Sequence, residues 1–182
     1  PTEIYTLSLH DALPICNIVM EANHISIPGT AWSWQKATNS LYRNNVGIVR
    51  WEKCGAVVAG LVSSQVDNNT LYGPGTVGKA TEYTRGIQLG EGGWENAVFR
   101  NNIVCNFVTD LFVSSSTGGE IEWSNNLIPR IADNSPARFV KPQILEVAPD
   151  PLFVEPGKDL RLREDSPARK AGVNLAHLFG TD

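Results

Sequence analysis

The chain has 182 residues, a length that suits one domain, and 42% of them are hydrophobic, which is enough to build a core. Its formal net charge of −4 and its pI near 5.4 argue against nucleic acid or an anionic membrane surface as the main partner. No apolar run approaches the length of a membrane-spanning helix, so membrane insertion is not expected.

The first residues need separate treatment, because residues 2–15 resemble the conceptual translation of a short-read sequencing adapter. Fourteen consecutive residues match that oligonucleotide when read back into codons, so we set residues 1–15 aside as an artefact outside the fold. Ser8, His10 and Asp11, which would otherwise look like a catalytic group, are discarded with them. We expect the chain to be a fragment that lacks the native N-terminus, any signal peptide and earlier repeats.

A short motif recurs from Cys16 onward. In most copies a bulky apolar residue is followed by a polar residue, an Asn, a second Asn that serves as the anchor, any residue and an apolar residue. The anchors are spaced by 22, 24, 33 and 24 residues, a near-constant period typical of a solenoid, so we predict rungs over residues 16–128. The anchors are Asn23, Asn45, Asn69, Asn102 and Asn126.

Each repeat divides into three short predicted strands, one before the anchor, one after it and one that completes the turn. Alternation such as Ile87-Gln88-Leu89 points apolar residues inward and a polar residue outward, as in a half-buried strand. The strands expected before the anchors are 18–21, 41–43, 65–67, 97–100 and 121–124. Those after them are 24–27, 46–49, 70–72, 103–105 and 127–128, and the third strands are 56–60, 86–89 and 111–114, with 32–35 less regular.

The Asn pairs are interpreted as corners of the scaffold. Asn tolerates the left-handed conformation of a sharp bend and bonds its own backbone. Asn amides stacked one rung above another also form ladders. A role of these Asn residues as sugar ligands is the alternative.

The 33-residue interval holds about ten extra residues, in 73–85 and in 90–95. Insertions in a repeat map to loops on one face, often the binding face, so chemistry is expected here first. The alternative is a solvated loop without function, which a chain tolerates at low cost.

The period fades after Ile128, and residues 129–182 are predicted to form a connector and a capping segment. A solenoid needs a cap over its exposed final core and its open strand edges. Ser166-Pro167 before Ala168-Arg169-Lys170-Ala171 predicts a short helical turn that Gly172 ends.

These repeats resemble right-handed parallel β-helix proteins of the pectate-lyase-like superfamily. The tail, with Asp150-Pro151-Leu152-Phe153, then Asp159-Leu160-Arg161-Leu162, then Ser166-Pro167-Ala168, resembles the ending of secreted bacterial β-helix proteins. One departure is Arg169-Lys170, where that ending usually carries an acidic residue. The resemblance implies an all-β right-handed parallel β-helix with three short strands per rung and a C-terminal cap. It also implies a secreted, periplasmic or cell-surface location and polysaccharide as the ligand.

The resemblance further implies a cleft on the sheet that starts each rung and on the loop before it. The outward row of that sheet would lie near Val58, Gln88 and Phe112, none of which can act as acid, base or calcium ligand. Calcium needs several oxygens that converge on one point, and this row offers none. We therefore expect no metal site and no cofactor, with calcium conceivable only if acidic residues of missing rungs contribute.

If the fragment is catalytic, its charged loop residues are the candidates. A carboxylate would serve as general acid or base, and a cation as base or as a clamp for a uronate carboxylate. Aromatic side chains of the same loops would offer flat platforms to sugar rings, although a solvated charged loop without function is the alternative. The candidate catalytic residues are Glu52, Lys79, Glu82 and Arg85, and the candidate substrate-binding residues are Trp51, Tyr83, Gln88 and Trp94.

Two further residue types carry little signal. His24 has no other His or Cys at ligand spacing, so a metal role is not expected. Cys16, Cys54 and Cys105 form no CxxC motif, and their pairing is left open.

Two functional hypotheses follow. The first is a secreted carbohydrate-active β-helix protein, a polysaccharide lyase or glycoside hydrolase that acts as a monomer. The second is a non-catalytic cell-surface or adhesin-like β-helix that binds glycans or has a structural role. Three or more charged side chains on the outward row would favour the enzyme, whereas Val58, Gln88 and Phe112 on that row would favour the second hypothesis.

Overall fold

The computed structural model describes residues 19–21, 24–27, 32–49, 55–75, 84–113, 119, 121–131 and 152–172. Residues 1–15, which resemble the adapter, lie outside this described part, as does most of the predicted connector.

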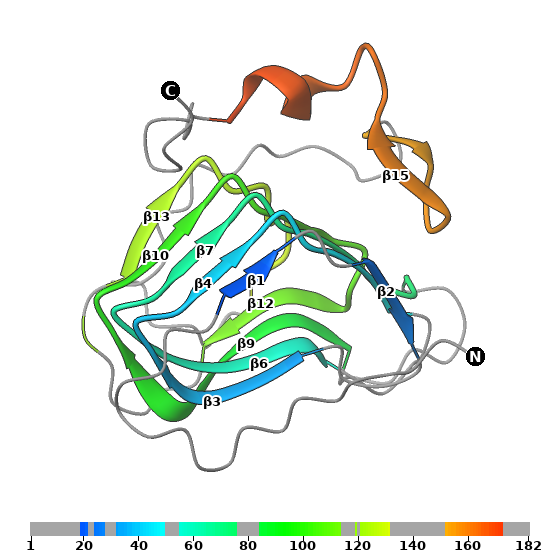
Figure 1. Ribbon diagram of the computed structural model, residues 1–182. Helices are drawn as coiled ribbons and strands as arrows, with labels where there is room; N and C mark the ends of the chain where they lie inside the picture. Colours follow the sequence, from blue (N-terminus) through cyan, green and yellow to red (C-terminus); the bar gives the residue numbers. More distant parts are fainter. Residues whose placement is uncertain are drawn as a thin grey trace.

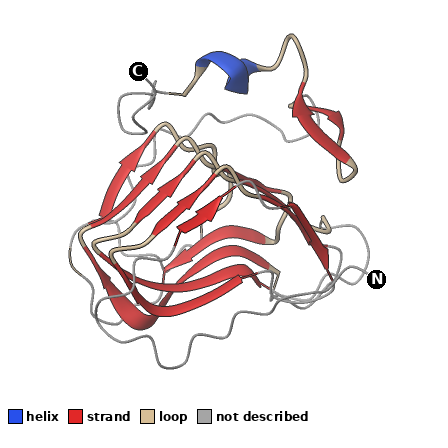
Figure 2. Ribbon diagram, viewed as in Figure 1, coloured by secondary structure: helices blue, strands red, loops and turns tan. Residues whose placement is uncertain are grey.

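Three parallel sheets make up the body of the described structure (Figures 1 and 2). Sheet A contains β1 (Val19–Glu21), β4 (Leu41–Arg43), β7 (Gln65–Asp67), β10 (Ala97–Arg100) and β13 (Ile121–Ser124). Sheet B contains β2 (His24–Ile27), β5 (Val46–Val49), β8 (Thr70–Tyr72) and β11 (Ile103–Cys105). Sheet C contains β3 (Trp32–Thr38), β6 (Gly55–Val62), β9 (Arg85–Glu95) and β12 (Thr109–Val113).

Each repeat passes through sheets A, B and C in that order, and each strand pairs in parallel with its counterpart one repeat later. The anchors Asn45, Asn69 and Asn102 each lie between a strand of sheet A and a strand of sheet B. The prediction of an all-β chain with parallel pairing and three strands per repeat is confirmed.

The long repeat differs from the prediction, because residues 90–95 continue β9 and do not form a loop. Leu89 pairs with Ala59, and Trp94 pairs with Leu61. Between these two pairs β9 therefore advances by five residues, whereas β6 advances by two. The intervening Gly90, Glu91, Gly92 and Gly93 form a wide bulge, which glycine tolerates well. The remaining extra length precedes Ile87, which lies 15 residues after Tyr72, whereas Val57 lies 9 residues after Ile48.

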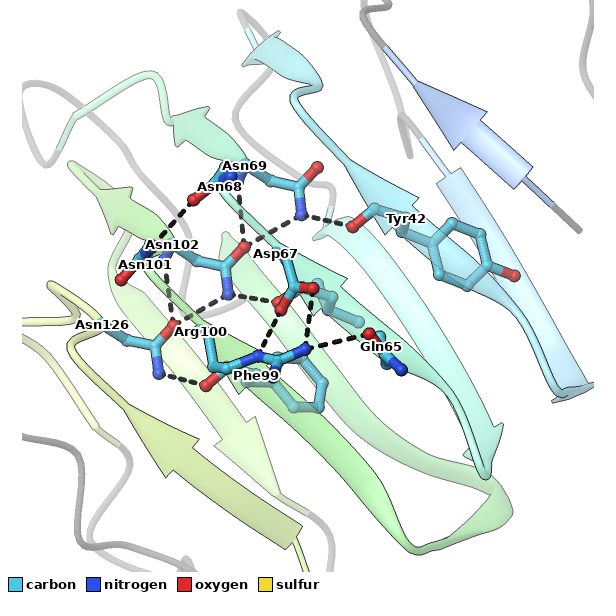
Figure 3. Close-up of polar contacts among 11 residues, drawn as sticks. Tyr42, Gln65, Asp67, Asn68, Asn69, Phe99, Arg100, Asn101, Asn102 and Asn126 are labelled. Atoms are coloured by element: carbon cyan, nitrogen blue, oxygen red, sulfur yellow. Dashed lines mark hydrogen bonds and ion pairs between the residues drawn. The ribbon is translucent and has the colours of Figure 1, made fainter. Parts of the chain in front are cut away.

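The corner between sheets A and B is built by the Asn pairs, as predicted. The first Asn of each pair adopts a left-handed backbone conformation, with φ between 54° and 56°. These residues are Asn44, Asn68, Asn101 and Asn125. The second Asn of each pair is buried and belongs to a ladder that runs from repeat to repeat (Figure 3).

In the ladder each anchor amide nitrogen donates to the side-chain oxygen of the next anchor. The Nδ2–Oδ1 distances are 2.9 Å from Asn45 to Asn69, 2.9 Å from Asn69 to Asn102 and 2.8 Å from Asn102 to Asn126. The same oxygens accept the backbone N–H of the previous anchor at 3.0–3.1 Å. The second amide proton reaches a carbonyl of the previous repeat, as from Asn102 to Val66 at 2.8 Å. The four described anchors, Asn45, Asn69, Asn102 and Asn126, are thus buried and hydrogen-bonded within the scaffold, which argues against a role of these four as sugar ligands.

A second corner, between sheets C and A, was not predicted. It places one left-handed residue in each of three repeats, namely Asn39, Ser63 and Asn96, with φ of 51°, 48° and 49°. Buried serines follow two of them, and the backbone N–H of Ser40 donates to Ser64 Oγ at 3.2 Å. This corner mixes Asn and Ser, so it leaves a weaker repeat in the sequence than the Asn pairs do.

The core lies between the inner faces of the three sheets. Sheet A contributes the bulky residues of the motif, and Phe99 and Trp123 stack with ring centroids 4.4 Å apart. The other buried residues come mainly from sheet C and from the corners, including Leu61, Ile87, Leu89, Trp94, Phe107, Leu111 and Val113. The apolar positions inferred from strand alternation therefore point inward.

The C-terminal segment packs on the outer face of sheet B. It contains the hairpin of β14 (Phe153–Glu155) and β15 (Asp159–Leu162) and the 3₁₀ helix η2 (Pro167–Lys170). Sheet B carries apolar residues on both faces, and such a sheet must be covered on both sides. The second cluster comprises Tyr72, Ile103, Cys105 and Leu127 from the body and Leu152, Phe153, Leu160, Leu162 and Ala168 from the segment.

Two further contacts fix the described part of this segment against the body. The Phe153 ring meets the Tyr72 ring edge-on at 5.8 Å, and Asn125 Nδ2 donates to the Ala171 carbonyl at 2.6 Å. The described contacts of 152–172 are thus with a lateral face and the adjoining Asn corner. The predicted short helical turn is confirmed as η2, which begins at Pro167.

We predict that Asn102→Ala lowers the free energy of unfolding by about 3–5 kcal/mol, because it strands several buried groups at a cost of about 1–3 kcal/mol each. The groups that lose a partner are the Asn69 N–H and amide, the Asn126 oxygen and the Val66 carbonyl. Urea denaturation measures the loss. The control is Asn101→Gly, which keeps the left-handed bend and removes one half-buried amide contact. Equal losses in both variants would contradict a dominant role of the ladder.

A second prediction concerns Ser63, whose left-handed conformation suits Asn or Gly better than Ser. Asn already stands at the equivalent positions 39 and 96. We expect Ser63→Asn to raise the free energy of unfolding by about 0.5–1 kcal/mol. The reverse change Asn39→Ser should lower it by a similar amount in the same thermal denaturation assay, and a gain in both variants would refute this explanation.

Candidate functional site

The outer face of sheet C carries the row of residues expected for a cleft. Val58 pairs with Gln88, and Gln88 pairs with Phe112, so the three occupy adjacent strands at one register. Ser33 of β3 continues the row. Gln88 and Phe112 are half-buried, whereas their neighbours Ile87 and Leu111 point into the core. The predicted alignment of Val58, Gln88 and Phe112 is confirmed.

Arg85 is the charged residue whose side chain reaches this row. It begins β9, and its guanidinium carbon lies 3.7 Å from the centroid of the Phe112 ring. Its Nη1 donates to Gln88 Oε1 at 2.8 Å. An aromatic face and an amide oxygen therefore hold the cation in place across two strands.

No carboxylate of the described residues forms an ion pair with Arg85. Among the described residues, its guanidinium donates to Gln88 alone, and its planar fork of N–H donors suits carboxylates and phosphates. Gln88 adds amide donors, and the half-buried Phe112 adds apolar surface. The arrangement can bind an anionic group next to an apolar ring, and among the described residues it includes no general acid or base.

The structure brings together two of the eight predicted site residues, Arg85 and Gln88. Trp51, Glu52, Lys79, Glu82 and Tyr83 lie outside the described residues.

Trp94 does not form the expected platform for a sugar. Its side chain is only 3% exposed and belongs to the main core cluster. The bulge of β9 explains the difference, because it returns the strand to register at Leu61 and turns Trp94 inward. The prediction of a binding role for Trp94 is therefore wrong.

The outer face of sheet A carries an ordered charged cluster that sequence reasoning missed (Figure 3). Arg100 donates to both carboxylate oxygens of Asp67 at 2.9 and 3.0 Å, and to Gln65 Oε1 at 2.9 Å. Arg43, Asp67 and Arg100 stand at one register on neighbouring strands. The sequence did contain a signal for this cluster, because Arg43, Asp67 and Arg100 alternate in charge at the second position before successive anchors.

Asp67 is fully buried, and burial raises the pKa of its carboxyl, against the lowering effect of Arg100 and Arg43. Both of its oxygens accept hydrogen bonds from Arg100, so the charges of Asp67 and Arg100 neutralise each other. We assign it a structural role in joining β7 to β10.

Within the described ranges, no three His, Cys, Asp or Glu side chains gather closely enough to hold a metal ion. The part of the chain that the structure describes contains no helix that is long and apolar enough to cross a membrane.

Comparisons of the chain with protein-family models, with curated proteins and with solved structures gave no match.

We predict that Arg100→Leu lowers the free energy of unfolding by about 3 kcal/mol at pH 7, because it leaves the buried Asp67 charge without its partner. The loss should shrink as the pH falls, since the raised pKa lets Asp67 become protonated, and the neutral acid needs no cation. The double variant Asp67→Leu/Arg100→Leu should regain most of the stability at pH 7. Denaturation of the three variants at pH 4 and pH 7 tests this, and a pH-independent loss would refute it.

Proposed function

We propose that the chain belongs to a right-handed parallel β-helix protein that binds an acidic polysaccharide on the outer face of sheet C. Three parallel sheets visited in a fixed order, joined by a buried Asn ladder, support the β-helix. The resemblance of the repeats and tail to the pectate-lyase-like superfamily supports polysaccharide as ligand and a secreted or cell-surface setting.

The observation that carries this proposal is the Arg85 guanidinium, held at 3.7 Å over Phe112 and bonded to Gln88, with no carboxylate of the described residues paired to it. A uronate carboxylate would receive two parallel N–H bonds from such a fork. Phe112 would lie against the apolar face of a neighbouring sugar ring.

Binding without catalysis is favoured over the enzyme by the composition of the row. Val58, Gln88 and Phe112 supply neither a proton acceptor nor a metal ligand. A glycoside hydrolase needs two carboxyl groups flanking the bond, and none lies on this row.

The lyase or hydrolase remains the second candidate because of where the insertion begins and ends. On one side, the Gly75 N–H donates to the Asn106 carbonyl at 2.8 Å. On the other, Thr84 directly precedes Arg85. The described ends of the segment that contains Lys79 and Glu82 therefore lie at Asn106 and next to Arg85, and in this second candidate those two residues supply acid, base or cation.

The test is a binding titration with oligosaccharides of polygalacturonate and alginate, with neutral xylan as the uncharged comparison. We expect binding to the acidic chains alone, and we expect Arg85→Met to weaken it by at least about tenfold, as for the loss of a charge-assisted hydrogen bond. Arg161→Met is the matched control, since Arg161 lies on β15 with its side chain 81% exposed. Failure to bind either acidic chain, or equal binding by Arg85→Met, would overturn the proposal. Release of unsaturated products or reducing ends would establish the enzyme.

A further inference from the structure

Asp110, the second residue of β12, is a buried carboxyl group that the candidate site does not use directly. It is fully buried, yet both of its oxygens accept hydrogen bonds from the backbone. The Phe107 N–H donates to Oδ1 at 3.0 Å, and the Arg130 N–H donates to Oδ2 at 2.9 Å. The carboxyl group therefore joins the corner before β12 to the chain of the following repeat.

Two more hydrogen bonds join the same part of the chain to that following repeat. Arg130 Nη1 donates to the Phe107 carbonyl at 2.7 Å, and the backbone N–H of Asp110 donates to the Arg130 carbonyl at 2.8 Å. Arg130 is the charged group whose field acts on Asp110 among the described residues. The corner of residues 107–109 is thus fixed from one side by Asp110 and Arg130 together.

On its other side the corner holds Thr84. The Val108 N–H donates to Thr84 Oγ1 at 3.0 Å, and the Thr109 N–H donates to the Thr84 carbonyl at 3.0 Å. Thr84 is fully buried and directly precedes Arg85. The corner therefore fixes the backbone at Thr84 and, with it, the point from which the Arg85 side chain extends.

The fit between β9 and β12 at this point is close. A Cβ atom on Gly86 would lie 2.5 Å from the Asp110 carbonyl oxygen and 2.3 Å from Val104 Cγ1. Neither contact leaves room for a side chain, so the strands approach one another as only glycine allows. A shift of Asp110 would therefore also displace Phe112, two residues further along β12, relative to Arg85.

We propose that Asp110 is a positioning residue for the Arg85 site, acting through the 107–109 corner and Thr84 to hold the guanidinium over the Phe112 ring. The proposal rests on the proposed function only for its effect on ligand affinity. The geometry that it explains, a cation stacked on an aromatic ring across two strands, exists without a ligand.

Asp110 also gives this arrangement a pH dependence. Burial raises the pKa of its carboxyl to about 7, although the N–H groups of Phe107 and Arg130 and the Arg130 charge lower it. Because the folded pKa lies above the unfolded value of 3.8, the stability contributed by this group is present below about pH 4 and is lost as the pH rises through about 7. Ionisation changes how strongly each oxygen accepts its N–H, so the corner and Arg85 should respond at the same pH.

The test that needs no ligand is NMR of the Arg85 side chain, whose Hε resonance is displaced by the ring current of Phe112. We expect Asp110→Ala to remove most of this displacement, and Asp110→Asn, which can satisfy only one of the two N–H groups, to remove part of it. In the wild type the resonance should titrate with a midpoint near pH 7, and in Asp110→Asn this midpoint should be absent. Phe112→Leu supplies the position of the unstacked resonance.

A destabilised control separates positioning from general loss of stability. Asn102→Ala weakens the ladder in another corner and should leave the Arg85 resonance unchanged. Binding of a galacturonate oligosaccharide should weaken about tenfold in Asp110→Ala, because small displacements of a recognition group are costly.

The outcomes of the two tests are distinguishable. An unchanged Arg85 resonance in Asp110→Ala, or an equal change in Asn102→Ala, would overturn the positioning role whatever the ligand. Absence of oligosaccharide binding by the wild type would overturn the proposed function and leave the resonance test intact.

Discussion

The hydrogen-bonded ladder of buried Asn side chains is the constraint on which the rest of the structure depends. The Asn69 and Asn102 amides each have a partner in the repeat before and in the repeat after, so these repeats cannot slip along one another without leaving buried groups unpaired. A fixed register at one corner fixes the register of all three sheets. The same parallel pairing between repeats aligns the residues on the outer faces, including Gln88 and Phe112 on sheet C.

The side chains on the outer faces of the three sheets make different kinds of contact. Sheet A pairs its charges internally, as in the contact between Arg100 and Asp67. Sheet B is apolar outside as well as inside and is covered by the C-terminal segment, with Phe153 against Tyr72. Sheet C carries a cation supported by a neutral amide and a ring. Among the described residues, Arg85 is therefore the charged group whose environment best suits an external anion.

Much of this fold could be predicted because the Asn pair has one physical role wherever it occurs. A left-handed bend followed by a stacked amide leaves a strong period, and strand alternation supplies the remainder. The bulge of β9 could not be read this way, since counting residues locates extra length without showing whether a strand absorbs it. Trp94 was misplaced for that reason. The outer face of sheet B was missed because short runs such as Ile103-Val104-Cys105 look the same whether one or both faces are buried. At the site, Arg85 and Gln88 were named from their types, but their contact with Phe112 depends on pairing between repeats.

The cover over sheet B also has a chemical consequence for Cys105. Its side chain is fully buried and packs in one cluster with Leu152 and Phe153 of the C-terminal segment. In an oxidising environment an accessible thiol is a source of unwanted cross-links. The C-terminal segment therefore also shields the Cys105 sulfur from solvent, and the rate at which a thiol reagent reaches Cys105 would report how often that cover opens.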